Sequence, residues 1–67
     1  MKRDVLQVSI AAAIARSRFR REEQMTFRGS DEAALQNYTE SARQDMMAAA
    51  AAVIDELVKL NVLKGVK

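Results

Sequence analysis

The chain has 67 residues, a net charge of +2, and neither cysteine nor histidine. A domain of this size buries only about 60% of the surface that its unfolded chain exposes, so a lone monomer is marginally stable. Small folds usually add disulfides, a metal or oligomerisation, and the missing residue types exclude disulfides and soft-metal sites. The composition therefore indicates one domain, 1–67, that needs oligomerisation or unusually good helix packing.

The composition also favours an all-α fold in a reducing compartment. Proline is absent, glycine occurs twice, and the many alanines are strong helix formers. No apolar run approaches the roughly 18–20 residues that span a bilayer, so we expect no membrane partner. The absence of cysteine fits a reducing environment, and we expect a cytoplasmic location.

A first helix is predicted over residues 4–25, with Asp4 as its N-cap. On a helical wheel its apolar residues fall on two nearly opposite sides, Leu6, Ile10, Ala13 and Ile14 on one, and Val5, Val8, Ala12, Ala15 and Phe19 on the other. An ordinary surface helix has a single apolar stripe. One side is therefore expected to meet another subunit or a partner, unless its short side chains simply lie exposed.

The segment 26–30 is the main interruption in the helical pattern. Gly29 can adopt the left-handed conformation that ends a helix, and Ser30 or Asp31 can cap the next one. The simplest architecture is an antiparallel helical hairpin joined at this turn and packed into a homo-oligomeric bundle.

A second helix is predicted over residues 31–63 and ends near Gly65, with a break near 37–39 or a short extra helix near 31–39 as the alternative. Its expected core stripe has near-heptad spacing and consists of Leu35, Ala42, Met46, Ala49, Val53, Leu57 and Leu60, widened on one side by Met47, Ile54 and Val58.

The sequence offers no catalytic constellation. Without histidine or cysteine, most acid–base and nucleophilic catalysis is excluded. The acidic pairs, such as Glu22 and Glu23, are sequence neighbours that diverge on a helix, and no glycine-rich phosphate loop is present. We therefore expect a protein that is not an enzyme and has no cofactor and no metal.

The densest polar signal is a cluster of arginines. The candidate phosphate contacts are Arg16, Arg18, Arg20, Arg21 and Arg28. They support nucleic-acid binding or, in an oligomer that adds an aromatic ring, a pocket that sequesters a small nucleotide. The alternative is a solvated basic face, because residues 1–30 carry seven basic and three acidic side chains and residues 31–67 carry four basic and six acidic ones.

The segments Ile10–Arg16 (IAAAIAR) and Tyr38–Arg43 (YTESAR), followed by an alanine-rich helix, give a layout that covers most of the chain. This layout resembles small helical accessory proteins of bacteriophages and prophages. The resemblance implies a phage origin and a protein that binds or inhibits a host factor. It carries over no catalytic or binding residue.

The leading hypothesis is a small interaction protein that self-associates, as a dimer or higher oligomer, and binds a host protein through apolar surface flanked by arginines. Methionines and aromatic residues are favoured at the centres of interfaces. The candidate interface residues are Val5, Val8, Phe19, Tyr38, Met46 and Met47. Each of them can instead belong to the intramolecular core.

Overall fold

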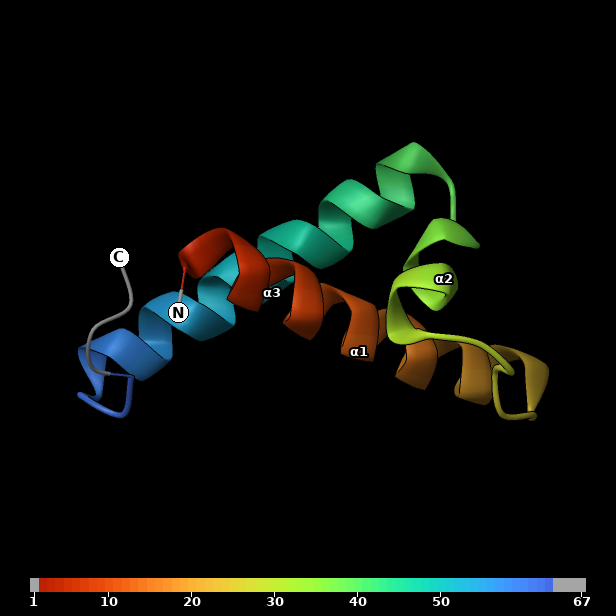
Figure 1. Ribbon diagram of the computed structural model, residues 1–67, viewed down its shortest axis with the longest axis horizontal. Coiled ribbons are helices and arrows are strands. Elements are labelled where there is room, and N and C mark those ends of the chain that lie inside the picture. The colour runs from red at the N-terminus through yellow and green to blue at the C-terminus, as the bar shows by residue number, and fades with distance from the viewer. Residues whose placement is uncertain (1, 64–67) are drawn as a thin grey trace.

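The protein folds into three helices in the computed structural model, which describes residues 2–63 (Figure 1). These helices are α1 (Arg3–Glu23), α2 (Asp31–Gln36) and α3 (Glu40–Lys59), and no strand occurs within the described range. Both α2 and α3 pack against the long α1. The all-α prediction is confirmed, and so is the alternative of a short extra helix, whereas the plain two-helix hairpin is wrong.

Left-handed residues other than glycine end α1 and α3. Gln24, with φ 55°, ends α1 at Glu23, two residues before the predicted end. Gly29, the residue expected to end the first helix, does not lie in the left-handed region. Its role is steric, because a Cβ there would lie 2.9 Å from the Phe27 ring.

The C-terminal end of α3 is set by Asn61 rather than by Gly65, which lies outside the described residues. Asn61 has φ 60°, and its N–H donates to the Val58 carbonyl at 3.0 Å, while the Val62 N–H donates to the Leu57 carbonyl at 2.9 Å. This pair of bonds is a Schellman motif. The helix therefore ends at Lys59, and the prediction that it continues to residue 63 is wrong.

Side-chain caps begin the two later helices. The Ser30 hydroxyl accepts the Ala33 N–H at 3.1 Å, as the sequence predicts, and the Thr39 hydroxyl accepts the Ala42 N–H at 3.2 Å. Asp4, by contrast, lies in the first turn of α1, whose N-cap is Lys2. Its carboxylate there still interacts favourably with the positive end of the helix dipole.

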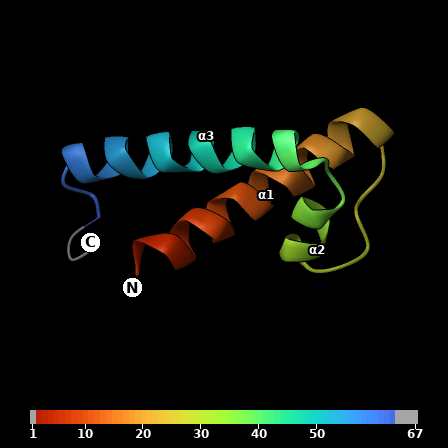
Figure 2. The ribbon, with the colours of Figure 1, turned by 90° about the horizontal axis from the view of Figure 1, so that it is seen from above.

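The two long helices run in opposite directions. Arg3 near the start of α1 pairs with Asp55 late in α3, and Arg18 near the end of α1 lies over the ring of Tyr38, just before α3. Between them, the Gln7 side-chain amide donates to the Met47 carbonyl at 2.9 Å. Figure 2 shows that the two helices cross at an angle, and α3 extends past the N-terminus of α1.

The core is small and rich in alanine. The buried residues are Ala11, Ala12, Ala15, Ala34, Leu35, Met46, Ala50 and Ile54. Alanine projects little beyond its Cβ, so the helix backbones can approach closely. The radius of gyration is 12.5 Å, whereas a compact chain of this length has about 11 Å. The helices therefore cross closely without closing around a large core.

The buried stripe of α3 differs from the prediction by a rotation about the helix axis. Met46 is buried as expected, and so is Ile54, which was expected to widen the stripe, but Ala50 is buried in place of Ala49, and both Ala49 and Val53 are exposed. The cause is that α1 crosses α3 at an angle and covers only one side of it. The C-terminal half of the predicted stripe is therefore left uncovered by the chain itself.

The close contact predicts that bulk is not tolerated at Ala50. Ala50→Leu should lower the free energy of unfolding by about 1–3 kcal/mol, because extra methylenes force the helices apart. Ala48→Leu, at an exposed position of the same helix, should change it by less than about 0.5 kcal/mol. Urea unfolding followed by circular dichroism measures both. Equal stability of the two variants would contradict the packing described here.

Candidate interaction surfaces

A row of apolar side chains on α3 lies open to solvent. We call it the α3 seam, and it consists of Ala49, Val53, Leu57 and Leu60. Val53 is 43% exposed and Leu60 is 61% exposed, while Leu57 is half-buried. The spacings of four, four and three residues place all of these side chains on one face of the helix. The seam is the type of surface through which helices pair in coiled coils.

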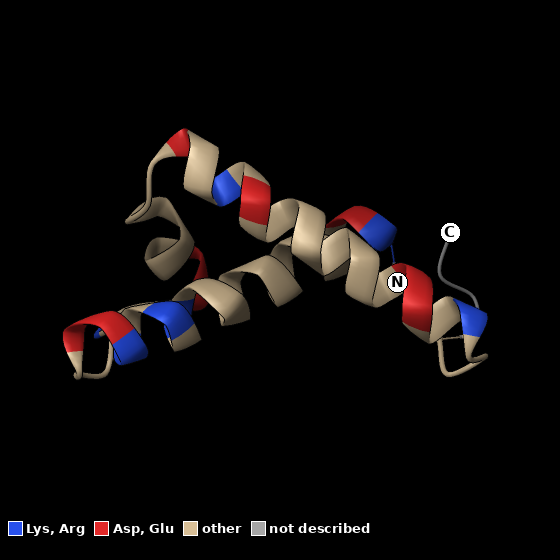
Figure 3. Cartoon of the chain, turned by 180° about the vertical axis from the view of Figure 1, so that it is seen from behind, with Lys and Arg blue, Asp and Glu red and all other residues tan. Residues whose placement is uncertain are grey.

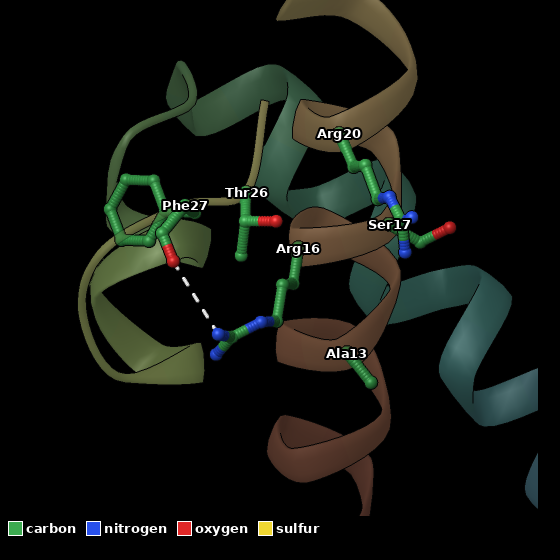
Figure 4. Close-up of a pocket in the computed structure, with 6 residues that line it drawn as sticks. All are labelled: Ala13, Arg16, Ser17, Arg20, Thr26 and Phe27. Carbon is green, nitrogen blue, oxygen red and sulfur yellow. Dashed lines mark hydrogen bonds between the residues drawn. The ribbon is translucent and has the colours of Figure 1, made fainter. Parts of the chain in front are cut away.

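A second surface on α1 is partly open to solvent, although its two isoleucines, Ile10 and Ile14, also pack against the edge of the buried core. We call it the α1 outer face, defined by Ile10, Ala13, Ile14, Ser17, Arg20 and Arg21. A shallow groove of about 430 Å³ is lined by five of these residues, all except Arg20. An adjoining pocket of about 260 Å³ brings Arg20 next to Ala13 and Ser17 (Figure 4). This face therefore combines half-buried isoleucines with two arginines.

Val5 and Val8 form a third apolar patch, and its surroundings differ from the prediction. Val5 is 59% exposed and Val8 is 36% exposed, so both side chains are open to solvent. The pocket that they line is completed by Asp4, Ser9 and Glu32. Acidic side chains, rather than arginines, thus border this patch.

The other predicted interface residues are engaged within the chain. Met46 is 4% exposed and belongs to the core, so a second protein has no access to it in this structure. Met47 is half-buried against the same core. The Phe19 ring packs edge-to-face on Phe27, with ring centroids 5.1 Å apart. Sequence periodicity could not decide whether Met46 packs in the core or at an interface, because both roles place it on the same face of the helix.

Arg16 fastens the loop between α1 and α2. Its guanidinium pairs with the Asp31 carboxylate at 2.7 Å and lies 3.4 Å from the carbonyl oxygens of Phe27 and Gly29. Figure 4 shows the side chain reaching from α1 toward the Phe27 carbonyl. The pairing of Arg16 with the acidic start of the second region follows the charge bias read from the sequence. Most of its donors are therefore committed within the chain.

Arg18 is also engaged by its own chain, at the crossing of α1 with the start of α3. It pairs with Glu22 one turn along α1, and its guanidinium carbon lies 5.1 Å from the centroid of the Tyr38 ring. The hydrogen bond that Arg18 donates to the Glu22 carboxylate raises the pKa of Arg18. Burial raises the pKa of the Tyr38 phenol, and the negative charge of Glu22 raises it further. Tyr38 is thus a packed contact rather than a free interface residue.

The remaining arginines of the cluster are Arg20, Arg21 and Arg28, all exposed. None of them forms an ion pair with any residue between 2 and 63. Figure 3 shows that charged residues gather toward the helix ends and leave the middle of α1 and of α3 uncharged. The structure therefore divides the cluster into two arginines that hold the fold and three that face solvent.

The contacts of Arg16 are expected to contribute measurably to the stability of the fold. Arg16→Ala should lower the free energy of unfolding by about 1 kcal/mol, because a partly exposed pair contributes little and the loop contacts add to it. Arg20→Ala, the matched control, should leave stability within about 0.5 kcal/mol of the wild type. A double-mutant cycle with Asp31→Asn measures the pair itself. A coupling energy of zero would contradict the assigned role.

The surroundings of Tyr38 predict that its phenol titrates at a higher pH in the folded protein than in the unfolded chain. Because it is the only tyrosine and the chain has no tryptophan, tyrosinate absorbance reports this group alone. Its midpoint should lie above about 10 in the native protein, return to about 10 in urea, and fall in Glu22→Gln. Since the folded state holds the proton more tightly, the associated stability is complete below about pH 10 and is lost as pH rises through the folded pKa. Identical midpoints in both states would disprove the shift.

No group of three acidic side chains lies close enough to hold a metal ion within residues 2–63. None of the helices in that range is long and apolar enough to cross a bilayer. Comparison with protein-family models, with curated proteins and with solved structures gave no match to this chain.

Proposed function

We propose that this protein works without enzymatic chemistry, as an interaction protein that self-associates and binds a second protein, which it thereby inhibits. The single observation that supports this most is the mismatch between core and surface. Within residues 2–63, five of the eight buried residues are alanines, whereas the exposed large apolar residues are Val5, Val8, Met25, Val53, Val58, Leu60 and Val62. A chain that leaves its larger side chains outside gains stability when another surface covers them.

The α1 outer face is the proposed docking surface for the second protein. Its isoleucines are half-buried and its arginines face solvent, which matches the apolar surface flanked by arginines that the sequence suggests. Arginine beside apolar side chains is enriched where interfaces carry most of their binding energy. The complementary partner is an apolar helix or loop that carries carboxylates.

Phosphate binding is the alternative function, through nucleic acid or a small nucleotide. The pocket beside Arg20 is also lined by Phe27 and by the hydroxyl-bearing Ser17 and Thr26, which favours this alternative. Against it, Arg16 and Arg18 are already paired with carboxylates, so two of the five arginines of the cluster are neutralised. Salt separates the two functions, because phosphate contacts weaken steeply as salt rises whereas apolar association persists.

Replacing Ala13 tests the proposed docking surface. Ala13→Glu places a carboxylate among the isoleucines and should reduce the amount of bound partner at least about tenfold, since a charge buried at an interface without a counter-ion costs more than 1.4 kcal/mol. Ala48→Glu, an exposed alanine of α3, should bind like the wild type. The measurement is affinity capture from nuclease-treated bacterial lysate at low and high salt, quantified by mass spectrometry.

The expected result is one protein, recovered with the wild type and with Ala48→Glu at both salt concentrations and lost with Ala13→Glu. Equal recovery with all three chains would rule out the α1 outer face. The capture is repeated from lysate that has not been treated with nuclease. If that sample yields nucleic acid and no protein, and the yield falls steeply as salt rises, phosphate binding replaces the proposal.

A further inference from the structure

We propose that a second copy of this chain docks on the α3 seam in the antiparallel sense, so that the Val53 side chains of the two copies face each other at a two-fold axis. This inference rests on the self-association in the proposed function and specifies its partner and geometry. It does not depend on the α1 outer face, which lies on a different helix.

The position of the seam is the first argument for a helical occupant. It adjoins the buried stripe formed by Met46, Ala50 and Ile54, so the same helix has two neighbouring apolar stripes. α1 covers the buried stripe, whereas three of the four seam residues are exposed and Leu57 is half-buried. A helix that carries two adjacent stripes is typical of one that packs against two other helices.

Side-chain size favours the antiparallel sense. With a two-fold axis at Val53, Ala49 lies four residues before the axis and Leu57 four residues after it. An antiparallel pair therefore places each Ala49 opposite a Leu57, small against large. A parallel pair would place the two alanines together and the two leucines together, which leaves a gap at one level and crowding at the other.

Charge supports the same sense. Asp45 and Lys59 lie on the same flank of the seam, about 40° apart on a helical wheel. In the antiparallel pair, Lys59 of one copy comes within about 3 Å, measured along the helix, of the level of Asp45 of the other. Figure 3 shows that the stretch between these two ends of α3 carries no charge up to Asp55. Opposite charges thus meet at both ends of an apolar centre.

The length of the seam sets the expected affinity. Residues 49–60 span about 18 Å of helix. One helix face of this length buries less surface than the roughly 800 Å² per partner of a standard interface. We therefore expect a weak dimer whose population depends on protein concentration.

Two valines of α3 provide a matched test by sedimentation equilibrium of the full chain, from low micromolar to near-millimolar concentration. Val53 is 43% exposed and lies in the seam, whereas Val58 is 41% exposed and lies on another side of the helix. Val53→Glu brings two carboxylates together at the axis and should weaken the dimer at least about tenfold. Val58→Glu should dimerise like the wild type. Circular dichroism confirms that both remain helical.

Single cysteines then determine the sense of pairing, because the chain has none of its own. In the antiparallel dimer Ala49→Cys does not cross-link with itself, but a mixture of Ala49→Cys and Leu57→Cys forms a disulfide between two copies. Cross-linking of Ala49→Cys alone would overturn the antiparallel geometry. A monomer at every concentration, or a dimer broken by Val58→Glu and not by Val53→Glu, would overturn the dimer. Since Ala13→Glu leaves the seam unchanged, loss of partner capture in that variant is independent of these outcomes.

Discussion

The structure depends on the close approach of α1 to α2 and α3 through alanine. Alanines from all three helices meet in the core, and in the described part of the chain only Leu35, Met46 and Ile54 add larger buried side chains. This contact lets helices pack at short distance, yet it removes little apolar surface from water per residue. The larger apolar side chains consequently remain on the outside of α1 and α3. The interaction surfaces thus follow from how the core is built.

Charged side chains fix the arrangement at the ends of this contact. Arg3 joins the start of α1 to the end of α3, and Arg16 and Arg18 hold the opposite end of α1 to the loop and to Tyr38. These pairs are exposed and individually weak, so they set register more than they add stability. The arginines that are left for a partner are those with no carboxylate of their own in residues 2–63.

Much of the fold could be read from local chemistry. The capping serine, the weak helix formers near 37–39 and the opposite charge of the two halves are all local signals, and each has a counterpart in the structure. Tertiary geometry could not be read in the same way. The crossing angle decides that Ala50 and Ile54 are buried and that Val53 is not, and periodicity alone cannot tell neighbouring stripes apart. Gln24 and Asn61 end their helices where glycine was expected, because a left-handed residue other than glycine has only a weak sequence signal.

The central claim is that the alanine core is completed by association. Its most direct test is the midpoint temperature of unfolding as a function of protein concentration, since association that favours the folded state raises the midpoint by mass action. The account predicts a midpoint that rises steadily with concentration. A midpoint that stays constant from low micromolar to near-millimolar protein, with a cooperative transition of the monomer, would contradict the account.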